Sequence, residues 1–505
     1  MMRNRTSGWL LVVLGMAILG LGAMAQGTPR YGGAVVIAMA AEAVTLDPLV
    51  ITDVASANVF AHIVEALFDL TPEGDLEPLL ATGYEVSPDG LTWTIPLRRG
   101  VTFHDGTPFN AEAAKFNLDR FRTRATFKFL IEAIQEVVVV DEYTIQLRLG
   151  TPFVPLLRGL AHGFTGMLSP TAVQAGKVEP VGTGAFKFVE WIRGDRIVLI
   201  KNPNYWGEGP YLDRVVFRPV LEPGTRVMML LTGEADIIHT VPPDDVPMVK
   251  ADPLTDVIRG PSFTTQYLGF NNRRAPFDDV RVRQAINYAL NKEEIVEHVL
   301  GGFAMVADAP IGPDVFGHHS VGPYPYDPEK ARELLAAAGY PDGFRTTLRF
   351  NPGWREVAAE LIQAQLRKVG IEIELIKMEW GAYLAFTAQP VDVNQIDMFM
   401  LGWVSVTGDA DYGLFPLFHT TEWAPKSNRV FYSNPRVDEL LSQARFVVNP
   451  DERKALYAEA IEIIWAEAPW GFLHVAEFVH GQRVGLHGVI YHPNLQVMVT
   501  RAWRQ

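Results

Sequence analysis

The segment 267–302, YLGFNNRRAPFDDVRVRQAINYALNKEEIVEHVLGG, joins a short extended run to two helical patterns. In the first pattern the apolar residues recur every three or four positions and form one stripe to bury: Val282, Ala285, Ile286, Ala289 and Leu290. Asp278 is a good N-cap for this helix. Asn291 closes it and caps the next, with Glu294 placed as in a capping box and Gly301 as the stop. The segment predicts two amphipathic helices packed on a sheet.

The length and the charge of the chain narrow the class of protein. With 505 residues the chain is too long for one ordinary hydrophobic core, so we expect two or three lobes. The formal net charge of −14 argues against a nucleic-acid partner, because phosphates demand a basic surface. The chain has no cysteine, so the fold uses neither disulfides nor thiolate metal sites.

Residues 1–25 have the pattern of a secretory signal peptide. Arg3 and Arg5 form the positive n-region, an uncharged apolar run follows from Trp9 to Leu21, and Ala23-Met24-Ala25 matches the small-residue cleavage rule. An uncleaved signal anchor is the alternative, because the charge-free run approaches membrane-spanning length. We expect cleavage and a periplasmic or other extracytoplasmic location.

Several motifs resemble one family. The order L-G-F-N-x-x-x-x-P-F-x-D-x-x-V-R-x-A-I-N-Y-A from Leu268 resembles the hinge-crossing segment of the peptide and nickel type of solute-binding protein, the extracytoplasmic receptors of ABC importers. The run 83–120, with W-x-x-x-L-R-x-G-V-x-F-x-D-G-x-P-F inside it, is similar to the signature of that family. The resemblance continues at 181–206 and 225–236 and covers nearly the whole mature chain.

The resemblance implies a bilobed α/β periplasmic-binding-protein fold with an extra domain in the N-terminal lobe and a ligand cleft between the lobes. The implied boundaries are 26–58 for the first segment of lobe 1, 59–180 for the extra subdomain, 181–268 for the second segment, 269–482 for lobe 2, and 483–505 for the return to lobe 1. Local signals predict a helix from about Asp53 to Phe68 and further helices capped by Asn110, Asp327, Asn434 and Asn449.

Two local patterns invite a catalytic or nucleotide-binding interpretation. Val181-Gly182-Thr183-Gly184 lacks the third glycine of a dinucleotide fingerprint and the Gly-Lys-Ser/Thr of a P-loop, and the chain continues as an extended run. His104-Asp105 fits a turn better than an acid–base dyad. Neither pattern therefore predicts catalysis.

The stretch 399–419, FMLGWVSVTGDADYGLFPLFH, carries the first candidate ligand groups. In dipeptide receptors an aspartate three residues after the tryptophan pairs with the α-ammonium of the peptide, and here that position is Val406. The stretch is similar instead to the glutathione-binding branch of the family. There Asp409 or Asp411 would accept the ammonium of the ligand, beside Trp403. The alternative is that both aspartates form the loop as Asx-turn residues.

Other candidates would complete a site for a peptide-like solute. Arg349 is the candidate for a ligand carboxylate, with Arg355 as a second choice. Trp380, Tyr383 and Trp403 either stack on the ligand or belong to the core. His162 lies in a segment that is near the cleft in the family, although a hydrogen-bonded structural histidine is the more common case.

The resemblance thus implies a receptor, not an enzyme, that needs no cofactor. We expect a monomer that delivers glutathione or a di- or oligopeptide to a membrane permease with its ATPase, and the missing cysteine leaves it without a lipid anchor. A nickel or haem receptor of the same fold is the alternative, for which His318, His319 and His492 are the candidate ligands. A secreted hydrolase is a further alternative, but G-x-S-x-G, H-E-x-x-H and a thiol nucleophile are all missing from the sequence.

Overall fold

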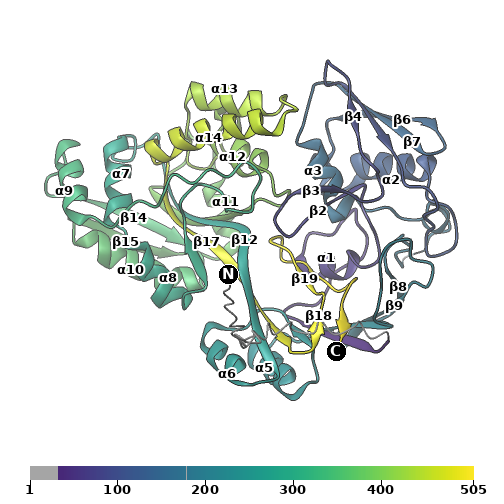
Figure 1. Ribbon diagram of the computed structural model, residues 1–505. Coiled ribbons are helices and arrows are strands. Elements are labelled where there is room, and N and C mark those ends of the chain that lie inside the picture. Colours follow the sequence, from purple (N-terminus) through teal and green to yellow (C-terminus); the bar gives the residue numbers. More distant parts are fainter. Residues whose placement is uncertain (1–31, 178) are drawn as a thin grey trace, which may run out of the picture.

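The computed structural model describes residues 32–177 and 179–505, which form two α/β lobes joined by two long strands (Figure 1). The predicted signal segment, residues 1–25, lies outside the described residues. None of the helices in residues 32–177 and 179–505 combines the length and the hydrophobicity of a membrane span.

One 11-stranded sheet runs through both lobes in the order β15-β14-β16-β12-β17-β11-β1-β10-β9-β8, with β13 added beside β17. The strands of the first lobe are β1 (Ala34–Met39), β8 (Phe186–Ile192), β9 (Arg196–Lys201), β10 (Arg214–Pro219) and β11 (Ile237–Ile238). Those of the second lobe are β13 (Ala304–Val306), β14 (Phe344–Phe350), β15 (Ile371–Lys377) and β16 (Met398–Val404). The two lobes therefore share one continuous hydrogen-bonded sheet.

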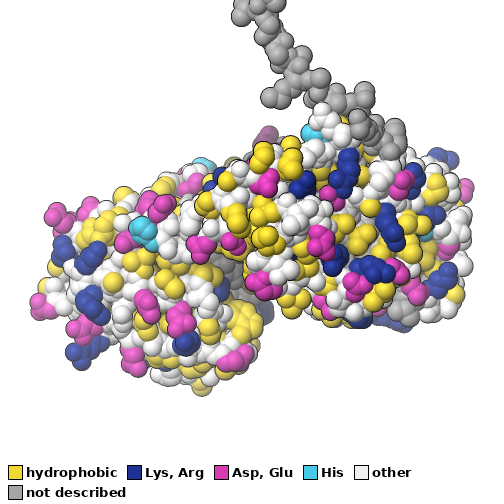
Figure 2. All heavy atoms as spheres, turned by 90° about the horizontal axis from the view of Figure 1, so that it is seen from below, with side chains coloured by type: hydrophobic (Ala, Val, Ile, Leu, Met, Phe, Trp, Pro, Cys, Tyr) yellow, Lys and Arg dark blue, Asp and Glu magenta, His cyan; other side chains and the backbone are white. Residues whose placement is uncertain are grey.

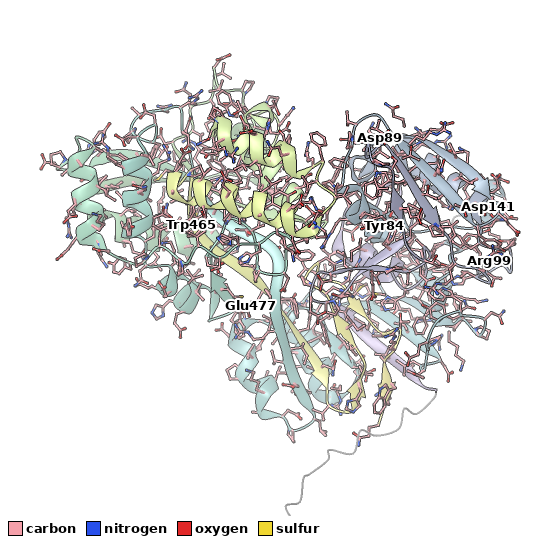
Figure 3. All side chains as sticks on the ribbon, turned by 45° about the horizontal axis from the view of Figure 1, so that its top comes forward. Tyr84, Asp89, Arg99, Asp141, Trp465 and Glu477 are labelled. Atoms are coloured by element: carbon pink, nitrogen blue, oxygen red, sulfur yellow. The ribbon has the colours of Figure 1, made fainter. Side chains whose placement is uncertain are left out.

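The crossing strands β12 (Thr255–Phe270) and β17 (Trp470–Arg483) pair antiparallel with each other in both lobes. Their register shifts between Pro261 and Thr265, which marks a bulge at the junction. Beside this point Arg259 of β12 pairs with Glu477 of β17, at 2.5 Å from Nε to Oε2; Glu477 is labelled in Figure 3. The boundaries predicted after residues 268 and 482 fall inside β12 and one residue before the end of β17.

The first lobe carries a second, four-stranded sheet that lies inside the range predicted for the extra subdomain. Its order is β4-β5-β7-β6, made of β4 (Glu85–Val86), β5 (Thr92–Pro96), β6 (Ile134–Asp141) and β7 (Thr144–Leu149). Its inward side chains are fully buried: Trp93, Ile95, Ile145 and Leu147. Helix α2 (Ala111–Arg124) packs against β6 and β7 and starts at the predicted cap, where Asn110 Oδ1 accepts the Ala113 N–H.

Shorter elements complete the first lobe. They are α1 (Val54–Phe60), β2 (Phe68–Leu70), β3 (Leu76–Pro78), α3 (Leu156–Ala161), α4 (Pro170–Gln174), α5 (Pro223–Thr232) and α6 (Val246–Ala251). After β17 the chain returns with β18 (Leu486–His487), β19 (Ile490–Tyr491), β20 (Val497–Met498) and β21 (Trp503–Arg504). The hairpin of β2 and β3 and the returning segment lie beside the cleft and supply part of the candidate site described below.

The predicted helix from Asp53 to Phe68 is wrong in its length, because α1 ends at Phe60. The carbonyls that would extend it bind another segment: Ile63 O accepts the Gly184 N–H and His62 O accepts the Phe186 N–H. This close approach explains the Gly-Thr-Gly motif. A Cβ on Gly182 would lie 2.1 Å from Ile63 O, so a side chain does not fit there.

The second lobe places its helices around β14, β15 and β16. They are α7 (Val280–Ala289), α8 (Lys292–Leu300), α9 (Pro328–Ala337), α10 (Trp354–Arg367), α11 (Trp380–Thr387), α12 (Ala410–Phe418), α13 (Pro435–Ala444) and α14 (Pro450–Glu467). The predicted caps Asp327, Asn434 and Asn449 are confirmed, each accepting a backbone N–H of the first turn. The alternation of strands and helices builds the edge that faces the first lobe.

The caps of α7 and α8 differ from the prediction in detail. Asp279, not Asp278, caps α7 by accepting the Arg281 N–H. Asn291 caps α8 as predicted, but the Asn291 N–H donates to Gln365 Oε1 rather than to Glu294. Gln365 in turn donates to Glu294 Oε2, so the capping box is bridged by a glutamine of α10.

Candidate functional site

Three parallel strands of the second lobe end at the same edge of the sheet. β14 pairs parallel with both β15 and β16, so the loops after all three strands lie together. These loops and the helices that follow carry Arg355, Trp380 and Asp409. Arg349 and Trp403 are the second-to-last residues of β14 and β16. Loops at this edge present the ligand groups in α/β sheets.

Asp409 is fully buried and is paired with an arginine of the chain. Its two oxygens bind Arg453, with Nη1 to Oδ2 at 2.8 Å and Nη2 to Oδ1 at 2.7 Å. Oδ1 also accepts the Asp411 N–H and caps α12, which is the loop-forming role considered above. Burial opposes ionisation, but the charge and hydrogen bonds of Arg453 outweigh it and lower the pKa of Asp409.

Asp411 is paired with a different arginine from the one that binds Asp409. Arg445 binds Asp411 with Nε to Oδ1 at 2.7 Å and Nη2 to Oδ2 at 3.2 Å. Burial raises the pKa of Asp411, and Arg445 offsets this only in part. The carboxylates of Asp409 and Asp411 are therefore both compensated within the chain, and a ligand ammonium would have to displace a bidentate arginine to reach them.

Of the three aromatic candidates, Tyr383 lies in the hydrophobic core, whereas Trp380 and Trp403 are partly exposed at the edge of the second lobe. Tyr383 is fully buried and donates from its hydroxyl to Met400 O, which makes it part of the core. Trp403 is half-buried, and its Nε1 donates to Tyr412 O. Trp380 is 45% exposed at the start of α11, and its ring lies against that of Tyr383 with 6.0 Å between ring centroids.

Three arginines around Tyr383 form a basic edge without direct ion pairs among the described residues, although the charge of Asp397 acts on Arg349. Arg355 is half-buried; its Nη2 donates to Gln266 Oε1 at 2.8 Å, and its buried Nε has no partner among the described residues. Arg349 donates to Thr347 Oγ1 at 2.7 Å and lies over the Phe386 ring. Arg429 donates to Thr387 Oγ1. Its charge acts to lower the pKa of Tyr383, against the larger rise that burial causes. None of the three arginines forms an ion pair within residues 32–177 and 179–505.

The first lobe faces this edge with a cavity of about 200 Å³. Its walls come from the segment after α1, the β2–β3 hairpin, α3 and the returning C-terminal segment, and Val406 of the second lobe also lines it. His162 lines the cavity and also has a structural role, because its Nδ1 accepts the Phe164 N–H. Burial lowers the pKa of His162 to about 4, so the ring is neutral at pH 7.

The two lobes touch at several further points, between residues 129–158 of the first lobe and residues 408–445 of the second. Arg158 of α3 donates to Gly408 O at 3.0 Å, and the Val154 N–H donates to Arg445 O at 2.8 Å. Phe129 of the first lobe stacks on Tyr412 with 5.3 Å between ring centroids. Figure 2 views the molecule from below and shows the two lobes with a hollow between them. Both signs of charge are scattered over the face seen there.

The histidines considered as metal ligands do not come together in one site. The described residues hold no group of three or more His, Cys, Asp or Glu side chains arranged for a metal ion. His318 lies 3.2 Å from Asp308 and His319 lies 3.1 Å from Glu462, whereas His492 lines the cavity. The sequence reasoning missed Arg429, Asp69 and Glu65, because a single charged residue in a loop or short strand carries no periodic signal.

Comparison with known proteins gives one consistent result. Residues 75–425 match the family model described as "Bacterial extracellular solute-binding proteins, family 5 Middle". The glutathione-binding protein GsiB of Pectobacterium atrosepticum is 37% identical over 471 residues, which is 91% of this chain and 92% of that protein.

Solved structures share the fold over almost the whole chain. The periplasmic binding protein DppA of Helicobacter pylori in complex with the peptide STSA is 32% identical, with a TM-score of 0.75, and the match covers 94% of this chain and 98% of that one. HbpA2 of Haemophilus parasuis is 26% identical, with a TM-score of 0.86, and the match covers 94% of this chain and 100% of that one.

Proposed function

The chain belongs to family 5 of the bacterial extracellular solute-binding proteins, and from this premise we propose that it is the receptor of an ABC importer for a small peptide-like solute, glutathione or a short peptide. The solute is held unchanged between the lobes. Closure of the lobes around it supplies the signal to the transporter through the difference in affinity between the open and closed forms.

The observation that carries the proposal is the set of arginines without acid partners at the edge of the second lobe. Among the described residues the Arg355 guanidinium donates hydrogen bonds to the amide oxygens of Gln266 and Asn351 and lies over the Trp354 ring, so it is partly desolvated without a carboxylate in contact. A ligand carboxylate supplies that charge and can bind in a bidentate manner. We propose Arg355 and Arg349 for the carboxylates of the solute, with Arg429 nearby and Trp380 stacking on its backbone.

The two halves of the candidate site are connected through β16. Arg355 contacts Gln266, which pairs with Gly402 on β16. The strand ends at Val404, and the chain then turns so that Val406 lines the cavity of the first lobe. For Asp409 and Asp411 we propose that they hold the loop that carries Val406, each through its arginine.

The remaining features follow from the family role. The partners are a transmembrane permease and an ATPase, and the protein acts as a monomer in the periplasm or another extracytoplasmic space. The signal segment is cleaved, and the mature chain is not tethered by lipid, since it has no cysteine. Nothing in this role requires a resident cofactor.

The test starts with native mass spectrometry of freshly isolated protein. Calorimetric titration with glutathione, the peptide Ser-Thr-Ser-Ala, nickel and haem follows. We expect a peptide-like probe to bind, and Arg355→Met to lower its affinity about tenfold or more while Arg345→Met does not. Arg345 is the control because it is exposed and lies at the opposite end of β14 from the loop that leads to Arg355. Binding of nickel or haem alone would refute the proposal, as would chemical change of the captured solute.

A further inference from the structure

The cavity of the first lobe contains a carboxylate that the chain leaves without a cation. Asp69 lies on β2 and lines this cavity of about 200 Å³. Its Oδ1 accepts the Leu70 N–H at 2.8 Å. Among the described residues no lysine, arginine or histidine forms an ion pair with Asp69. Its charge therefore has no counter-charge, in contrast to those of Asp409 and Asp411.

The neighbours of Asp69 make its charge more costly. Asp69 stands directly opposite Glu77 in the antiparallel β2–β3 ladder, and Glu77 also lines the cavity. Like charges directly opposite each other in a ladder are destabilising. Burial raises the pKa of Asp69 to about 6, and the charge of Glu77 adds to this rise. A cation bound between these carboxylates would relieve both costs.

Apart from Glu77, which is exposed, the other charged groups of the cavity are already engaged. Glu65 accepts hydrogen bonds from Thr183 Oγ1, Tyr205 Oη and Trp206 Nε1, at 2.7, 2.8 and 2.9 Å. Arg158 is directed to Gly408 O and Asp409, and Arg501 lies 3.7 Å from Glu208. Burial lowers the pKa values of His162 and His492 to about 4, so both rings are neutral at pH 7. The free acceptor in the cavity is thus Asp69.

We infer that Asp69 accepts the protonated amine of the solute, so that the amino end lies in the first lobe and the carboxylates lie at the arginines of the second lobe. This inference rests on the proposed function and names the polarity and the chemical class of its solute. Val406 lines the same cavity, so the amine lies at the contact between the lobes. A solute that bridges an acidic first lobe and a basic second lobe stabilises the closed form through both ends.

The test compares probes with and without a free amine. The parent protein, Asp69→Asn and the control Asp75→Asn are titrated with glutathione and with N-acetylglutathione. Asp75 lies in the turn of the same hairpin, is exposed and does not line the cavity. We expect the parent and the control to bind the free amine at least tenfold more tightly than the acetylated probe, since a charge-assisted hydrogen bond is lost. Asp69→Asn is expected to bind both probes alike.

Several outcomes overturn the inference without touching the proposed function. One is that Asp69→Asn keeps the preference of the parent for the free amine; another is that the parent shows no such preference. If neither probe binds, the solute retained by freshly isolated protein decides. A basic nitrogen in that solute, together with its loss from Asp69→Asn, supports the assignment, whereas a solute without a basic nitrogen, or equal retention by the variant, refutes it. The melting temperature of each variant shows that it is folded.

Discussion

Arg158 of the first lobe and Asp409 of the second lie 3.9 Å apart, from Nε to Oδ2, with side chains only 6% and 0% exposed. Arg453 binds the same carboxylate through both of its oxygens. A buried carboxylate between two arginines of one chain is a structural element that joins the lobes. Its position at the end of the sheet had made it a candidate for contact with the ligand.

The first prediction concerns the stability of this pair. Asp409→Asn should lower the free energy of unfolding by about 3–5 kcal/mol, because it leaves Arg453 buried without a counter-charge. Urea unfolding of the solute-free protein measures the effect. Glu372→Gln, which removes the partner of the exposed Arg345, should change stability by less than about 1 kcal/mol. An unchanged melting curve combined with weakened solute binding would instead place Asp409 in the ligand site.

The second prediction concerns the contact between the lobes. Arg158→Met removes the hydrogen bond to Gly408 O and the charge near Asp409 but keeps the length of the side chain. We expect the solute-free protein to sample more widely separated lobes, seen as a larger radius of gyration in X-ray scattering, and Arg158→Lys to restore part of the parent value. The control is Arg148→Met in the same lobe, which is exposed. Equal scattering curves for all variants would show that this contact does not hold the lobes.

The third prediction concerns the Gly-Thr-Gly motif. Gly182→Ala should cost several kcal/mol of unfolding free energy, on the order of 2–4, because its Cβ would lie 2.1 Å from a backbone oxygen that is itself hydrogen-bonded. Gly83→Ala is the control, since a Cβ there meets nothing within 4 Å. Thermal unfolding of the two variants makes the comparison. Equal melting temperatures would mean that the two segments can separate without cost.

The fourth prediction concerns pH. Burial raises the pKa of Glu65 from 4.5 to about 7, against the opposing hydrogen bonds of Trp206, Thr183 and Tyr205. Between pH 4.5 and 7 the folded protein keeps Glu65 protonated, whereas the unfolded chain has released that proton. The stability that Glu65 contributes is therefore fully present below pH 4.5 and is lost as the pH rises through 7. Asp69 acts in the same direction, with a pKa raised to about 6.

The measurement for Glu65 is the melting temperature of the solute-free protein from pH 4.5 to 8. Relative to Glu65→Gln, the melting temperature of the parent should fall as the pH rises over this range, because the buried histidines contribute equally to both proteins. Glu136→Gln, which changes an exposed glutamate of the same lobe, should show no such pH-dependent difference from the parent. A difference between the parent and Glu65→Gln that stays constant with pH would contradict the prediction.

Much of the fold could be predicted from the sequence, because its signals are local. The caps at Asn110, Asp327, Asn434 and Asn449 and the stripe of α7 each involve residues within one or two turns. The length of α1 could not be predicted, since it depends on two carbonyls that bind Gly184 and Phe186, more than a hundred residues away.

The candidate site depends even more on contacts between residues that are far apart in the sequence. The sequence made Asp409 and Asp411 candidates, but their partners Arg453 and Arg445 follow 44 and 34 residues later, and no pattern links them. Asp69 looks like one polar residue in a short strand until the fold places it in a cavity opposite Glu77. Charge compensation is a property of the folded arrangement, and the sequence order does not reveal it.

The crossing strands β12 and β17 have a consequence for how the lobes move. Because the two strands are hydrogen-bonded to each other on both sides of the register shift, they bend together as one ribbon instead of acting as two independent tethers. Opening and closing then follow essentially a single angle. A partner in the membrane needs to sense only that angle, and one fluorescent label on each lobe would suffice to follow capture of the solute in real time.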